Sequence, residues 1–152
     1  MTLLDAQQFD EARERRRKAI IGVVVLAVVA VAILVWFNRY WPEEHIANKF
    51  FAALQKQDYE TAFGIYYNDP TWKQHPEKYS KYPINEFRQD WGTGGPWGLI
   101  KTYKVHGASG CPGGGSGVVV DVIVNDRAEH AQIWVEKSDR TLSTPPCDLL
   151  FQ

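Results

Sequence analysis

The sequence has almost no charge excess and few thiols, and both shortages limit what the chain can be. Its 17 basic side chains nearly balance 18 acidic ones, which gives a formal net charge of -1. Such a chain lacks the positive field with which proteins hold nucleic acid, so we expect no nucleic-acid partner. It has only 2 cysteines, no Cys-x-x-Cys pair and no Gly-Lys-Ser/Thr phosphate loop. The motifs therefore predict no catalytic residue, no cofactor and no metal site.

Charged and strongly polar side chains are missing from residues 19–37, which read AIIGVVVLAVVAVAILVWF. A helix of that length rises about 28 Å at about 1.5 Å per residue, close to the thickness of the hydrocarbon core of a bilayer. We therefore predict a transmembrane helix at 19–37, with the lipid bilayer as its first partner.

Different side chains flank the two ends of this apolar run. The residues expected at the membrane interfaces are Arg15, Arg16, Arg17 and Lys18 before it, and Trp36, Tyr40 and Trp41 around its end. Basic residues stay on the cytoplasmic side, and aromatic rings favour the interface. No small-x-small cleavage site follows, which predicts an uncleaved signal anchor. We expect residues 1–18 in the cytoplasm, residues 38–152 outside it, and the bacterial inner (cytoplasmic) membrane as the location.

Beyond the anchor the hydrophobic period changes from helical to alternating. Helical spacing and capping residues predict helices at 42–54, 58–66 and 83–91, and alternation predicts strands at 97–106, 117–125 and 130–137. Residues 125–128 read as the turn between the last two strands. Helices followed by strands define an α+β domain with about three helices packed on an antiparallel sheet.

Three stretches carry a resemblance to a known superfamily: ANKFFAALQKQDYETAF at 47–63, FRQDW at 87–91 and GLIKTY at 98–103. Over residues 42–137 the pattern resembles the nuclear-transport-factor-like superfamily, whose members wrap helices around a curved sheet to form a cone. The resemblance implies a cavity, which we expect to be lined by Tyr66, Phe87, Tyr103 and Trp134. Enzymes of that superfamily place Asp, His and Tyr inside the cone, and no position here matches them residue by residue. The anchored domain of cytochrome oxidase assembly factors is a second resemblance that fits the paired helices less well.

The two cysteines, Cys111 and Cys147, both lie in the predicted outer domain. In an oxidising compartment they favour a disulfide, which would stabilise the fold by about 3 to 4 kcal/mol and tie the glycine-rich loop at 107–117 to the C-terminal segment. Two free thiols or a metal-binding pair are the alternatives.

Trp91 and Trp97 flank a glycine-rich turn. If exposed, they form a contact for a protein partner, and if buried, they close the core; both alternatives stay open. His106 and His130 fall on predicted strands and Asp121 on another, so a base and a carboxylate, with Tyr103, are conceivable as a catalytic set. We favour the simpler interpretation that these are solvent-facing strand residues.

Three functions remain, in order of preference. The first is an anchored extracytoplasmic interaction module, an accessory or assembly subunit bound to other membrane-protein subunits of a respiratory or photosynthetic complex. The second is a module that binds a small apolar molecule or a lipid, and the third is an isomerase or dehydratase. The absence of catalytic motifs and an aromatic content of 13% favour the first.

Overall fold

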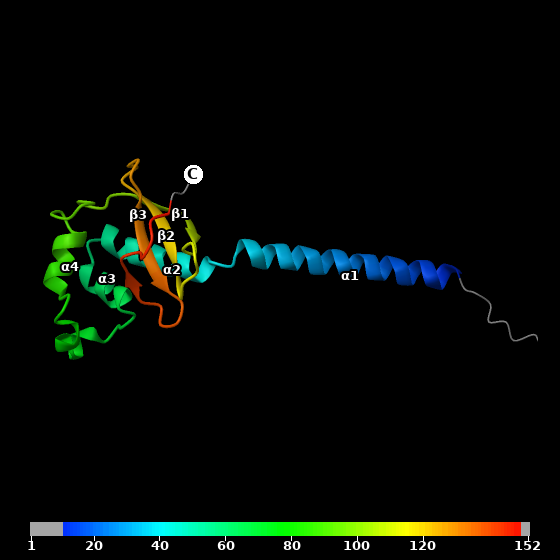
Figure 1. Cartoon of the computed structure of the whole chain (residues 1–152), viewed down its shortest axis with the longest axis horizontal. Helices are drawn as coiled ribbons and strands as arrows, with labels where there is room; N and C mark the ends of the chain where they lie inside the picture. Colours follow the sequence, from blue (N-terminus) through cyan, green and yellow to red (C-terminus); the bar gives the residue numbers. More distant parts are fainter. Residues whose placement is uncertain (1–10, 150–152) are drawn as a thin grey trace, which may run out of the picture. The chain divides into compact units, whose positions relative to one another are not determined.

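The structure is a computed structural model that describes residues 11–149 (Figure 1). It divides the chain into two units, of which the first ends at Arg39 and the second begins at Tyr40. The first ten residues of the predicted cytoplasmic segment lie outside the described residues.

The first unit is dominated by helix α1, which spans Glu11–Phe37. None of its most apolar stretch of 18 residues is buried within the chain. Valine and isoleucine are modest helix formers in water, and a helix that exposes them on every side is typical of a membrane span. Near its start, Lys18 forms an ion pair with Glu14 at 2.8 Å, and after its end the Arg39 guanidinium lies 4.3 Å from the centre of the Trp36 ring. Helix α1 is therefore a candidate membrane anchor.

The second unit begins with helices α2 (Trp41–Gln55) and α3 (Tyr59–Tyr66), followed later by α4 (Ile84–Trp91). All three confirm the sequence prediction, because their signals are local. Pro42 stands in the first turn of α2, where its missing N–H group is not needed. Asp58 caps α3, since its carboxylate accepts a hydrogen bond from the Thr61 N–H at 3.0 Å.

Residues 67–83 connect α3 to α4 and contain two short 3-10 turns, η1 (Trp72–Gln74) and η2 (Pro76–Tyr79). Asp69 organises this connection. Its carboxylate accepts hydrogen bonds from the Tyr79 hydroxyl, from His75 at 2.6 Å and from Thr71. These bonds, the Tyr79 bond first, hold the pKa of the Asp69 carboxyl well below its usual range.

Four antiparallel strands form one sheet in the order β1-β2-β3-β4. They are β1 (Tyr103–Ser109), β2 (Gly117–Val124), β3 (Ala131–Glu136) and β4 (Leu142–Ser143). Helix α2 packs across β1, β2 and β3 (Figure 1). The core between helices and sheet is rich in phenylalanine, and Phe50, Phe51, Phe63 and Phe87 are fully buried. The domain is thus α+β, as the sequence predicts.

The first strand was placed too early by the sequence pattern. Residues 97–102 are a loop, because the side chain of Asn125 forms hydrogen bonds with backbone groups of this segment. Its Oδ1 accepts from the N–H groups of Lys101 (2.8 Å) and Thr102 (3.2 Å), and its Nδ2 donates to the Leu99 carbonyl (2.9 Å). Asn125 sits in the predicted hairpin turn with a φ of 53°, a conformation that asparagine tolerates.

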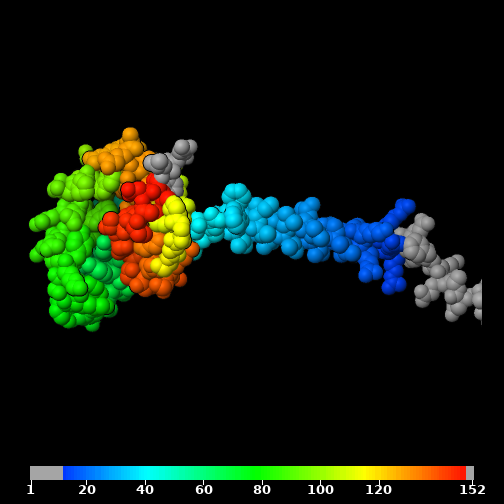
Figure 2. Space-filling view, in the orientation of Figure 1, coloured from blue at the N-terminus to red at the C-terminus, as the bar shows by residue number. Residues whose placement is uncertain are grey.

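The face of the sheet that points away from the helices is also covered. The loop at 110–116 packs over Trp134, and a Cβ atom on Gly117 would lie 2.7 Å from the indole ring and 2.3 Å from the Val135 carbonyl. A disulfide joins Cys111 to Cys147, as expected, and binds this loop to the C-terminal segment. Figure 2 shows the two segments, yellow and red, side by side on the domain surface.

Replacing Asp69 by Asn is expected to lower the thermal midpoint of the full-length protein in detergent, because it weakens the bonds to Tyr79 and His75. The folded-state pKa of Asp69 is depressed, so its stabilisation is complete above about pH 4 and is lost as the pH falls below that value. The difference between wild type and D69N should therefore shrink from pH 7 to pH 2. The exposed hairpin variant D126N is the control, and a difference that does not depend on pH would contradict the assignment.

Removing the disulfide with the double variant C111S/C147S is expected to lower the free energy of unfolding by about 3 to 4 kcal/mol, through loop closure over the 36 positions that separate the cysteines. Denaturant titration of the oxidised and reduced wild type gives the same comparison without mutation. Equal stability of the two redox forms would show that the cover of the outer face does not depend on the cross-link.

Candidate functional site

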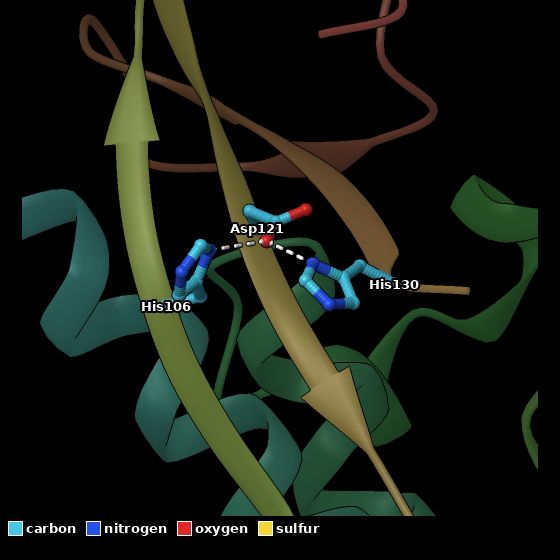
Figure 3. A group of neighbouring side chains, drawn as sticks. All are labelled: His106, Asp121 and His130. Carbon is cyan, nitrogen blue, oxygen red and sulfur yellow. Dashed lines mark hydrogen bonds and ion pairs between the residues drawn. The ribbon is translucent and has the colours of Figure 1, made fainter. Parts of the chain in front are cut away.

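Asp121 lies near the middle of β2, the most apolar strand of the domain, and is completely buried. Its neighbours along the strand are valines, and a carboxylate among them adds nothing to the hydrophobic packing. A buried carboxylate is unfavourable unless polar or positively charged groups surround it. Asp121 therefore requires specific partners, and it finds them in strand β1 and in the residue just before β3 (Figure 3).

The first partner, His106, is brought in by an irregularity in β1. The register between β1 and β2 shifts between Val105 and Gly107, so that His106 is the extra residue of a β-bulge. Bulges re-aim side chains, and here the His106 Nδ1 lies 3.1 Å from the Asp121 Oδ2. Gly107 stands directly opposite Asp121 and adds no side chain of its own, so the space beside the carboxylate is left to His106.

The second partner, His130, immediately precedes β3. Its Nδ1 lies 2.6 Å from the same Oδ2 atom of Asp121. The two imidazole rings are edge to face, with their centres 5.3 Å apart. The side chains of His106 and His130 are 34% and 24% exposed, whereas that of Asp121 is 1% exposed. The cluster therefore has its charge inside and its two rings at the surface.

Gln132 completes the surroundings of Asp121. Its Nε2 lies 3.4 Å from Oδ1, the carboxylate oxygen that the histidines do not contact. The same amide group pairs with the backbone of Leu149, donating to its carbonyl at 2.5 Å and accepting from its N–H at 3.2 Å. Gln132 thus links the cluster to the C-terminal segment that the disulfide holds.

This geometry corrects the sequence interpretation of these residues. Asp121 is not solvent-facing, and His106, His130 and Asp121 do come together. Tyr103 does not join them: its ring stacks on Phe51 of α2 at 5.9 Å, and its hydroxyl donates to Asn48 at 3.0 Å. The three-residue cluster offers one ligand atom from each member, all within 4.8 Å of one another, so it has the donor set of a metal site.

A groove of about 730 Å³ forms the second feature of the domain. Trp91 and Trp97 both line it, half-buried, and both also pack against the core. The other aromatic and acidic residues of its wall are Tyr66, Tyr67, Tyr82 and Asp90. Burial raises the pKa of Tyr66 to about 12, and burial together with the hydrogen bond to Asp90 raises that of Tyr82. These hydroxyls therefore stay neutral at physiological pH.

The four aromatic residues expected in one cavity are not gathered around a common space. Phe87 is fully buried, with its ring against Phe50 at 6.0 Å and Phe63 at 5.4 Å. Tyr66 lines the groove. Trp134 pairs with Val119 on the sheet face opposite to that of Ile133 and Val135, under the glycine-rich loop, whereas Tyr103 packs on the helix side.

The residues expected at the membrane interfaces flank the apolar run of the candidate anchor, and their interface role stays a prediction. Arg15, Arg16, Arg17 and Lys18 are in the first turns of α1 and Trp36 is in its last. Tyr40 and Trp41 open the second unit, and Trp41 is 59% exposed.

The chain matches no protein-family model, no curated protein and no solved structure. The nuclear-transport-factor-like assignment therefore stays a prediction, and the functional argument depends on the geometry alone.

Replacing Gln132 by Leu is expected to expose the Leu149 N–H to solvent exchange, because its acceptor, the Gln132 Oε1, is removed. Hydrogen–deuterium exchange of the C-terminal peptide measures this directly. The variant Q89L, which changes an exposed glutamine of α4, is the control. Unchanged protection of Leu149 in Q132L would mean that the disulfide alone holds this segment.

Proposed function

We propose that the chain is a single-pass, membrane-anchored interaction module, and that it serves as an accessory or assembly subunit of a larger membrane complex. The observation that carries the proposal is helix α1, whose apolar side chains are exposed by half or more along its length. A helix of this kind needs a bilayer to cover it. The domain that follows it is small and has a packed aromatic core, which suits a module that binds other proteins.

The proposed orientation places the N-terminus in the cytoplasm and the α+β domain outside it, at a bacterial inner membrane. The basic residues before the apolar run and the aromatic residues after it support this direction. The disulfide supports it as well, since disulfides persist in oxidising compartments such as the periplasm.

The groove beside Trp91 and Trp97 is the proposed docking surface for another subunit. Tryptophan and tyrosine supply much of the binding energy of protein interfaces, because they bury a large area and lose little side-chain entropy. Grooves lined by such rings accept extended apolar or proline-rich segments. We infer that an extended, apolar segment of a neighbouring membrane protein occupies this groove, with Asp90 and Tyr82 at its polar edge.

A small apolar molecule or lipid is the second candidate occupant. The volume of about 730 Å³ falls within the usual range of small-ligand pockets, and the aromatic wall suits an apolar ligand. The isomerase or dehydratase alternative gains no support, because neither His106, Asp121 nor His130 is among the residues that line this groove.

Gentle detergent extraction of the tagged full-length protein, followed by native electrophoresis and mass spectrometry, tests this function. The wild type should migrate in a stoichiometric large complex. Variant W97A should weaken that association by about 30-fold or more, equivalent to the roughly 2 kcal/mol typical of an interfacial tryptophan. Variant W72A removes another half-buried tryptophan outside the groove and should leave the complex intact.

Two results would count against the proposal. Migration of the wild type as a lone monomer or dimer would contradict the subunit function, and a lipid co-purifying with that monomer would favour the second candidate. Equal complex formation by W97A and W72A, with both folded, would show that the groove is not the docking surface.

A further inference from the structure

The surroundings of Asp121 are short of positive charge. Among the described residues its hydrogen-bond partners are the two imidazoles and the amide of Gln132, and none is a lysine or arginine. A completely buried carboxylate in a strand of valines is retained at a considerable cost in desolvation. A divalent cation that the imidazoles also coordinate would supply a permanent positive charge beside this carboxylate.

The donor types select the class of cation. Two imidazole nitrogens and one carboxylate oxygen suit zinc and other divalent transition metals. Calcium and magnesium prefer shells made of oxygen ligands, so two nitrogen donors count against them. Copper(I) prefers thiolate and thioether ligands, and both cysteines of the chain are held in the disulfide.

The distances fit a single ion with little movement. Donor atoms about 2.0 to 2.1 Å from a tetrahedral zinc lie about 3.4 Å from one another. The two Nδ1 atoms already lie 3.1 and 2.6 Å from Oδ2, and the three donors are within 4.8 Å. Small rotations of the two histidine side chains bridge the difference. Both rings are partly exposed, so the cluster lies at the surface of the domain, where an ion and a water as its fourth ligand would enter from solvent.

The residues around the three donor atoms also support them as the surroundings of protein metal sites do. Metal-binding carboxylates are usually held by a further hydrogen bond, and here the Gln132 amide holds Oδ1 and leaves Oδ2 to the histidines. The bulge at His106, together with the absence of a side chain at Gly107, lets the His106 ring approach Asp121, which a regular strand pairing would not allow. Local features of three strands thus converge on one oxygen atom.

We propose that His106, Asp121 and His130 bind one divalent transition-metal cation, with Zn²⁺ the best match, through the two Nδ1 atoms and Oδ2. In the hydrogen-bonded arrangement each Nδ1 carries a proton that it donates to the acceptor-only carboxylate. Binding requires the other tautomer, so the proton of each ring moves to Nε2 and the neutral imidazoles present their Nδ1 lone pairs. The ion then joins β1, β2 and the residue before β3, and because only the folded chain assembles the site, binding stabilises the fold.

The test uses the full-length protein in detergent with its disulfide intact, stripped with a chelator and desalted. Isothermal titration with ZnCl₂ should give one Zn²⁺ per chain, and Zn²⁺ should raise the thermal midpoint. Variants H106Q and H130Q, at partly exposed positions, should each weaken binding by at least about 100-fold and abolish the thermal shift. Variant H75Q is the matched control, because His75 also contacts a carboxylate at 2.6 Å but has no second histidine there. It should bind Zn²⁺ as the wild type does.

Three further measurements test the assignment. Variant Q132L should weaken binding by about 10-fold while keeping the stoichiometry, since it loses only the support of Oδ1. The absorption spectrum of the Co²⁺-loaded protein should show tetrahedral coordination by nitrogen and oxygen, and CaCl₂ should produce no heat of binding at the same concentrations.

Three outcomes would overturn the proposal. Absence of Zn²⁺ binding to the folded wild type would leave the three side chains as a hydrogen-bonded element of the sheet. Stoichiometric binding that survives both H106Q and H130Q would place the ion elsewhere. Binding of Ca²⁺ in preference to Zn²⁺ would contradict the donor chemistry.

Discussion

Because strand β2 is buried on both faces, the domain has to cover its sheet twice. The alternate residues Val118, Val120 and Val122 face the helices, and α2 supplies the first cover. Val119 and Asp121 face the other way and are just as completely buried. On that side a glycine-rich loop and the C-terminal segment provide the second cover. The disulfide, the close packing on Trp134 and the clamp of Gln132 on Leu149 all follow from this requirement.

The sequence predicted the helices well because their signals are local. Pro42, Asp58 and the spacing of the phenylalanines each act within one turn or two, and all three helices were confirmed. The predicted start of β1 was too early, because the hydrogen bonds that keep residues 97–102 out of the sheet come from a residue far along the chain, Asn125. The two-residue strand β4 is too short to show a period, and it was missed.

The candidate site was recognised only in part. Histidines on two strands and a carboxylate between them were noted, yet the solvent-facing interpretation was wrong for Asp121. The signal was present: an uninterrupted run of valines is typical of a strand buried on both faces, and a single aspartate within it is therefore buried too. The bulge that turns His106 toward Asp121 depends on strand pairing, which no local pattern reveals. The four aromatic residues expected around one cavity lie apart, and ring-on-ring packing of this kind is decided only in three dimensions.

The cross-link between Cys111 and Cys147 makes the two covers of the sheet differ in their dependence on redox conditions. The helix-side core contains no cysteine and can form as soon as the chain is long enough. The covalent bond that joins the two segments of the outer cover forms only where thiols are oxidised. A chain retained in a reducing compartment would have its valine face shielded by two segments with no covalent bond between them, and Gln132 would still hold the C-terminal segment at Leu149. The redox state of the two thiols would thus distinguish a domain that has met an oxidising environment from one that has not.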